Sequence, residues 1–238
     1  MKNIKTLAFS IFGGLLALTV VTFGTPISAE AATEVAAPTA IQAPADEITD
    51  QEALQFMVEE EKLARDVYLT LYEEWNSRIF QNIAGAEQTH MDAIRTLFTT
   101  YDVDDPTEGN DIGVFENDEL RALYVGLVET GSQSLADALK VGAAIEEIDI
   151  LDLEEYIAAT DNADIELVYE NLLKGSENHL RAFVSTLEQQ TGEVYVSQYM
   201  VQADYDAIIN ADTETGGNGQ GGSNSGDGNN NGGGGRGK

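Results

Sequence analysis

The chain contains two histidines, and each lies one helical turn after a residue that interrupts an otherwise apolar stripe. In the first stripe, Glu87 and His90 have i, i+3 spacing, which places both side chains on one helix face. A carboxylate and an imidazole placed in this way can bind one metal ion, and Glu-x-x-His is the ligand pattern of di-iron carboxylate bundles. In the second stripe, Ser176 and His179 take the same two places, with a hydroxyl instead of the carboxylate.

Two other segments with helical periodicity carry an acidic pair near the middle of the apolar stripe. The pairs are Glu60 with Glu61, and Glu146 with Glu147. Successive helix residues differ by about 100° in direction, so periodicity leaves open which member of each pair faces inward. A buried charge without a partner costs at least several kcal/mol. These groups must therefore be paired, protonated or bound to metal.

Carboxylates and imidazoles together suit divalent iron, manganese or zinc. The candidate ligands lie on four separate helical segments, and we predict that they meet at similar depth in one core. A buried hydrogen-bond network without metal is the competing interpretation. The candidates are Glu60, Glu61, Glu87, His90, Glu146, Glu147 and His179.

The composition narrows the possible classes of function. The chain has 12 Lys and Arg against 42 Asp and Glu, so its net charge is 12 − 42 = −30. Such a charge argues against nucleic acid and anionic membrane surfaces as partners, because both require clustered basic residues. The absence of cysteine excludes disulfides, Cys-ligated zinc, iron–sulfur clusters and a rubredoxin-like electron donor within the chain.

The elements that must position the candidate ligands are helices, and strand signals are few. Capping patterns such as Thr49 with Glu52 mark the helix starts. Two hairpins of long helices, joined by a connection of about 30 residues, predict an all-α, ferritin-like four-helix bundle with one long crossover connection between helices two and three. The connection includes an acidic loop, 102–113. The predicted helices cover 49–75, 78–101, 117–129, 134–159, 161–192 and 199–210.

The two ends of the chain have different compositions from the middle. Residues 1–31 predict a signal peptide, with Lys2 and Lys5 before an apolar run and small residues near position 31. An uncleaved anchor is the alternative, although about 17 apolar residues fall short of the length that spans a bilayer. Residues 32–48 form an Ala/Pro/Thr-rich linker, 49–212 the helical domain, and 213–238 a Gly/Asn-rich tail predicted to be disordered. We therefore expect an exported protein: secreted, periplasmic or at the cell surface.

Four sequence motifs also resemble one family. They are EEEKLARDVY at 59–68, AEQTHM at 86–91, VGAAIEEIDI at 141–150 and GSENHLRAF at 175–183. In this order they resemble the DUF2202 family, uncharacterised ferritin-like proteins of bacteria and archaea. The resemblance implies a ferritin-like bundle with a dinuclear metal centre, with two irons as the expected cofactor, and no established reaction. Ser176 stands where related ferritin-like proteins have a Glu, which implies an asymmetric pair of ions or one strong and one weak site.

In such a centre, Glu61 or Glu60 would be a terminal ligand and Glu87 would bridge the ions. His90 and His179 would supply nitrogen, with Glu146 or Glu147 as the remaining carboxylate. Tyr68 and Tyr169 lie on the same stripes and pack there or donate a hydrogen bond or an electron. The expected partners are metal ions together with O₂ or peroxide. Nucleic acid is not an expected partner, and neither is a membrane after signal cleavage. The sequence is compatible with a dimer.

The implied activity is ferrous-iron oxidation or redox chemistry linked to O₂ or peroxide. A second hypothesis is a non-enzymatic exported scaffold or binding module with a metal-free polar core. In that case the acidic loop and the glycine-rich tail would contact the partner.

Overall fold

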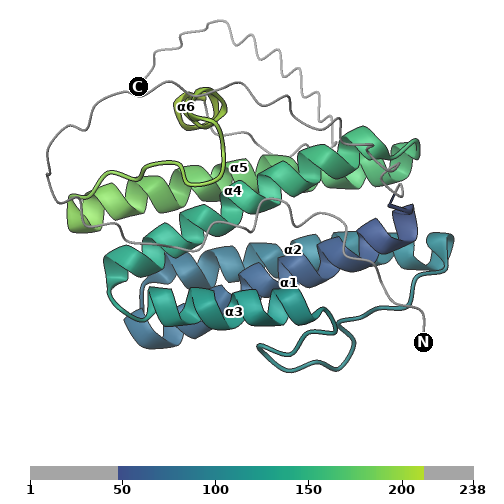
Figure 1. Ribbon diagram of the computed structural model, residues 1–238, viewed down its shortest axis with the longest axis horizontal. Helices are drawn as coiled ribbons and strands as arrows, with labels where there is room; N and C mark the ends of the chain where they lie inside the picture. The colour runs from purple at the N-terminus through teal and green to yellow at the C-terminus, as the bar shows by residue number, and fades with distance from the viewer. Residues whose placement is uncertain (1–47, 212–238) are drawn as a thin grey trace, which may run out of the picture.

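A computed structural model describes residues 48–211, and the predictions for residues 1–47 and 213–238 lie outside this range. The described part is all-helical and contains no strand, which confirms the predicted class (Figure 1). None of its helices is long and apolar enough to cross a membrane. The helices are α1 (Asp50–Trp75), α2 (Arg78–Tyr101), α3 (Asp118–Gly131), α4 (Leu135–Ala159), α5 (Ala163–Thr191) and α6 (Gln202–Asn210).

The four long helices pack in a bundle-like arrangement made of two hairpins (Figure 1). Helix α1 packs along α2, and α4 packs along α5; the hairpins meet through α1 with α4 and through α2 with α5. The connection from α2 to α4 contains α3, which lies against both α1 and α4. Helix α6 packs on α5.

Side-chain caps explain where three of the six described helices begin. Thr49 and Glu52 form the predicted capping box at the start of α1. The Asn117 side chain accepts hydrogen bonds from two backbone N–H groups of α3, and the Ser134 hydroxyl accepts one at the start of α4. Gly192 ends α5 in the left-handed conformation, with φ of 76°, which a glycine adopts at little cost.

Two predicted helix starts were wrong. Helix α5 does not begin with a cap at Asp161; its N-cap residue is Asn162, and the predicted cap partner, Asp164, accepts a hydrogen bond from the Tyr101 hydroxyl. Helix α6 begins at Gln202 and not at residue 199. The preceding residues 198–200 instead form a bend, in which their N–H groups donate to the Glu147 carboxylate of α4.

The buried core is divided in two by a layer of polar side chains. One apolar cluster includes Tyr68, Phe80 and Phe183, and the other includes Met57 and Tyr169. Between them lie fully buried polar groups from all four long helices, as the interrupted stripes predicted. The layer comprises Glu60, Glu61, Glu87, Glu146, Asp149 and Ser176.

Candidate metal centre

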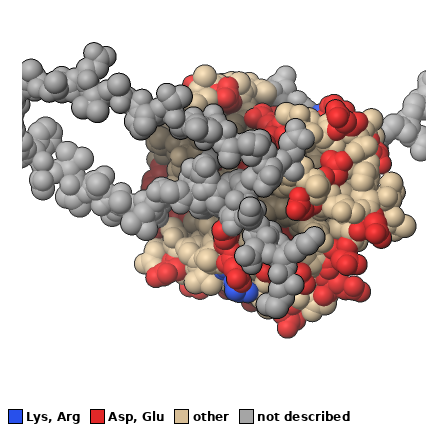
Figure 2. All heavy atoms as spheres, turned by 45° about the vertical axis from the view of Figure 1, so that its right-hand side comes forward, with Lys and Arg blue, Asp and Glu red and all other residues tan. Residues whose placement is uncertain are grey.

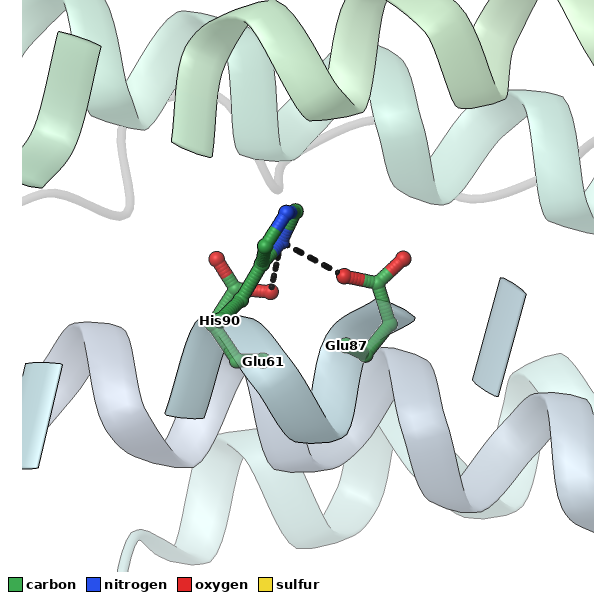
Figure 3. Close-up of side chains that lie close together, drawn as sticks. All are labelled: Glu61, Glu87 and His90. Carbon is green, nitrogen blue, oxygen red and sulfur yellow. Dashed lines mark hydrogen bonds and ion pairs between the residues drawn. The ribbon is translucent and has the colours of Figure 1, made fainter. Parts of the chain in front are cut away.

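Two groups of three side chains in the polar layer have donor atoms close enough to hold a metal ion. One group is Glu61 with Glu87 and His90; the other is Glu87 with Glu146 and His179. Within each group the donor atoms all lie within 4.8 Å of one another. Figure 3 shows the first group, whose side chains extend from α1 and α2 toward the opposite pair of helices. Glu87 belongs to both groups and lies between the two histidines.

The two carboxylate oxygens of Glu87 face different imidazole rings. Its Oε2 lies 2.8 Å from Nδ1 of His90, and its Oε1 lies 2.9 Å from Nδ1 of His179. Each ring nitrogen also has a second carboxylate, Glu61 Oε2 at 3.2 Å from His90 and Glu146 Oε2 at 3.4 Å from His179. The two rings are stacked, with centroids 5.5 Å apart. The arrangement is therefore a pair of similar half-sites that share one carboxylate.

These spacings fit donors that surround a metal ion. Metal bonds of about 2.0–2.2 Å at angles of about 90–110° place neighbouring donors roughly 2.8–3.6 Å apart. The observed range, 2.8–3.4 Å, agrees. Although His179 Nδ1 and Glu87 Oε1 are 2.9 Å apart, neither atom makes a directed hydrogen bond. Glu61 Oε1 and Asp149 Oδ1 are also buried without a hydrogen-bond partner. Such atoms are better satisfied by a shared cation than by one another.

Burial and the two imidazole rings shift the pKa values of the candidate carboxylate ligands. Burial would raise the pKa of Glu87, but attraction to His179 and His90 outweighs burial and holds that pKa well below its usual range. Burial raises the pKa of Glu61 well above its usual value, and the nearby Asp149 carboxylate raises it further. Burial and Asp149 thus favour the protonated form of Glu61, whereas the two rings favour the ionised form of Glu87.

The two histidines carry protons for a related reason. Burial alone would lower the pKa of each ring, but the surrounding carboxylates reverse that effect. Glu87 and Glu146 raise the pKa of His179 to about 10, and Glu61 and Glu87 raise the pKa of His90 well above its usual value. Because metal-bound imidazole must be neutral, loading this centre would displace protons.

The centre is closed on its carboxylate side and slightly open on its histidine side. Glu61, Glu87 and Glu146 are almost completely buried, whereas the His90 and His179 side chains are 12% and 13% exposed. Gly175 of α5 makes room for one ring, since a Cβ there would lie 2.5 Å from Nε2 of His90. The histidine rings, which extend from α2 and α5, thus lie on the slightly exposed side of the centre.

Consecutive acidic residues of α1 point to different neighbours because each is rotated by about 100° from the last. Glu59 accepts hydrogen bonds from the backbone N–H groups of Glu116 and Asn117, just before α3. Glu60 faces the Asp152 carboxyl of α4, and Glu61 faces His90. Of the predicted pair, Glu61 therefore belongs to the candidate centre and Glu60 lies beside it.

The other predicted pair is separated in the same way. Glu146 faces His179, whereas Glu147 lies outside both groups of donors. The Oε2 atom of Glu147 accepts backbone hydrogen bonds from Gln198 at 2.9 Å and Tyr199 at 2.7 Å. Glu147 thus fastens the segment before α6 to the bundle.

Glu147→Gln is therefore expected to loosen that segment and leave metal binding unchanged. A neutral acceptor replaces a charged one, which should cost about 1–2 kcal/mol. Hydrogen–deuterium exchange of the Tyr199 amide should become roughly tenfold faster. Glu146→Gln is the matched control and should show the opposite pattern, with weaker metal binding and unchanged exchange at Tyr199. Loss of metal in Glu147→Gln would contradict this assignment.

Sequence reasoning missed Asp149 of α4. Asp149 is buried, acts electrostatically on Glu61 and Glu146, and accepts a hydrogen bond from the Ser176 hydroxyl. The Ser176 hydroxyl also lies 3.1 Å from the Leu172 carbonyl oxygen. Because it has one proton, it donates to either Asp149 or Leu172 at a given moment. The signal was available, because Asp149 follows Glu146 with the same i, i+3 spacing as Glu87 and His90. Asp149 thus places a carboxylate of the neighbouring helix beside Ser176.

The two tyrosines on the inward stripes have different surroundings. The Tyr68 hydroxyl lies 2.5 Å from Glu146 Oε1 and donates a hydrogen bond to it. The Tyr68 ring packs against Phe80 and Phe183. The Tyr169 hydroxyl is buried and has no hydrogen-bond partner. Tyr68 therefore orients a candidate ligand, whereas Tyr169 does not contact one by a hydrogen bond.

Comparison with known proteins identifies the family. Residues 50–212 match the family described as "Uncharacterized protein domain (DUF2202)". The chain is 54% identical over 169 residues to the uncharacterised protein MJ0754 of Methanocaldococcus jannaschii, a match that covers 71% of this chain and 91% of that protein. The crystal structure of MJ0754 superposes with a TM-score of 0.68 at 52% identity, covering 73% of this chain and 99% of the other. This chain therefore belongs to the DUF2202 family, as its four motifs predicted.

Proposed function

We propose that this protein holds a dinuclear iron centre in a ferritin-like four-helix bundle formed by α1, α2, α4 and α5. The observation that carries the proposal is the position of Glu87, whose two oxygens lie 2.8 and 2.9 Å from imidazole nitrogens of two different helices. A carboxylate between two nitrogen donors, each with its own second carboxylate, is suited to bridge two ions. Glu61 with His90 would complete one half-site, and Glu146 with His179 the other.

The charges of the centre support two divalent ions. Glu61, Glu87, Glu146 and Asp149 are four buried carboxylates, which carry four negative charges when all are ionised. Two divalent cations would balance them with both imidazoles neutral. Mixed oxygen and nitrogen donors suit iron or manganese, and zinc is also compatible. The buried donor atoms without hydrogen bonds, such as Asp149 Oδ1, then have a physical role.

Iron bound in this way would supply electrons to O₂ or peroxide, so the activity we propose is ferrous-iron oxidation or peroxide-linked redox chemistry. The residues around the centre would orient one of its ligands and keep water away from it. Tyr68 holds the Glu146 carboxylate in one orientation through its hydroxyl, and the apolar clusters on both sides exclude water. A peroxidase would need an external electron donor, because the chain has no cysteine for a rubredoxin-like one. Export, which rests on residues 1–31 alone, is part of the proposal.

The deciding experiment is metal loading of the chain purified without chelators. After anaerobic addition of Fe²⁺ and gel filtration, elemental mass spectrometry should find about two irons per chain. Loading near pH 7 should release protons from the two histidines and from Glu61, so affinity should increase as the pH is raised. Admission of O₂ should produce a near-ultraviolet absorption band. One ion per chain would contradict the dinuclear centre, and no binding would favour the scaffold hypothesis.

A further inference from the structure

A second carboxylate pair lies beside the candidate centre, between α1 and α4. It consists of Glu60, which is only 4% exposed, and Asp152, which is half-buried. Their carboxyl groups face each other across the two helices. Two carboxyl groups in contact require a shared proton or a bound cation, because two bare negative charges would repel strongly.

The groups that act most strongly on Glu60 are all carboxylates, namely Asp152, Asp149 and Glu61. One oxygen of Glu60, Oε2, is buried and has no hydrogen-bond partner. The buried Tyr169 hydroxyl, which interacts electrostatically with Glu60 and Glu61, has none either. Unsatisfied oxygens at this depth are unusual and indicate a ligand; a hydrated cation can satisfy both the carboxylate oxygen and the hydroxyl.

The pair also connects the surface with the centre. Asp152 follows Asp149 by one helical turn on α4, and Glu60 directly precedes Glu61 on α1. Carboxylates therefore continue inward from the half-buried Asp152, past Glu60, to Asp149 and Glu61. Outside this path the surface is strongly acidic, as Figure 2 shows for one face, and the net charge of −30 draws cations toward the protein.

We propose that Glu60 and Asp152 form a transfer site for a hydrated divalent cation, which binds there before it moves to the dinuclear centre. The inference rests on the proposed function and concerns how that centre is filled. Carboxylate oxygens and retained water bind Fe²⁺ or Mn²⁺ without the nitrogen donors that make the centre tight. The site therefore holds the ion weakly and releases it inward to Glu61 and Asp149.

Co²⁺ is a suitable probe because its visible spectrum reports ligand binding without oxidation. Stopped-flow mixing of the metal-free full chain with Co²⁺ measures the loading rate, and equilibrium titration measures the number of ions. Glu60→Gln and Asp152→Asn should each slow loading at least tenfold while about two ions still bind at equilibrium. Glu166→Gln, an exposed position on α5, changes the net charge equally and should load at the original rate.

Other outcomes separate this inference from the proposed function. Loading of both variants at the original rate would overturn the transfer site and leave the centre intact. Loss of an ion at equilibrium in Glu60→Gln would show that Glu60 is a ligand of the centre, and this result would also overturn the transfer site. Failure of the unmodified chain to bind Co²⁺ would overturn the centre itself. Asp152→Asn, at a half-buried position, keeps the test valid if Glu60→Gln does not fold.

Discussion

Glu87→Gln is expected to abolish the binding of both metal ions, not of one. Its two oxygens face the two histidines separately, so a neutral amide removes the only carboxylate that both half-sites share. The affinity for each ion should fall at least 100-fold, which corresponds to about 2.8 kcal/mol. Calorimetric titration with Mn²⁺, confirmed by elemental analysis after anaerobic loading with Fe²⁺, measures the change.

The terminal ligands provide graded controls for this result. Glu61→Gln and Glu146→Gln each alter one half-site and should weaken mainly one ion, and Asp149→Asn should weaken binding without removing either. Circular dichroism must show that Glu87→Gln keeps its helices. If Glu87→Gln loses only one ion, the bridging geometry is wrong and the two half-sites are independent.

Helices and the depth of the polar layer could be predicted from sequence because both depend on local patterns. Caps at Thr49 and Ser134 mark helix starts, and stripes on α2 and α5 place Glu87 and His179 at similar depth. Asp161 was the exception, since the helix is capped one residue later and Asp164 contacts Tyr101 of a distant segment. Such contacts leave no local signal.

The sequence could not show which acidic residue of α4 faces the candidate centre, and the reason is physical. Every residue from 141 to 150 is buried, because α4 contacts α1, α3, α5 and the segment before α6. A helix with neighbours on all sides has no single apolar stripe, so no face is marked as inward. Glu146, Glu147 and Asp149 are equally buried and serve three different neighbours.

The motif that identifies the family also contains an ion pair with a structural role. Lys62 of α1 is 1% exposed; its ammonium donates to the Asp66 carboxylate and, at 2.9 Å, to the Asp111 carbonyl oxygen. It also lies over the Phe115 ring, 4.5 Å from the centroid. Asp66 in turn accepts the backbone N–H of Gly113 at 2.9 Å. One buried pair thus fixes the acidic crossover loop against α1.

Asp66→Ala is therefore expected to destabilise the protein by about 3–5 kcal/mol, because it leaves the Lys62 ammonium buried without its counter-ion. Urea unfolding followed by circular dichroism measures the free energy. Asp118→Ala is the matched control, since it breaks an exposed pair with Arg121 and should cost less than about 1 kcal/mol.

Adding Lys62→Met to Asp66→Ala should recover part of the loss, because it removes the buried ammonium that has lost its counter-ion. The Gly113 N–H still loses its acceptor, so recovery should be incomplete and the crossover loop should exchange amide hydrogens faster than in the unmodified chain. If the single variant loses less than about 1 kcal/mol, the ammonium must reach water, and the loop is not held by this pair. Retained metal binding in the folded double variant would show that these two residues of the motif hold the loop, while Glu61 serves the centre.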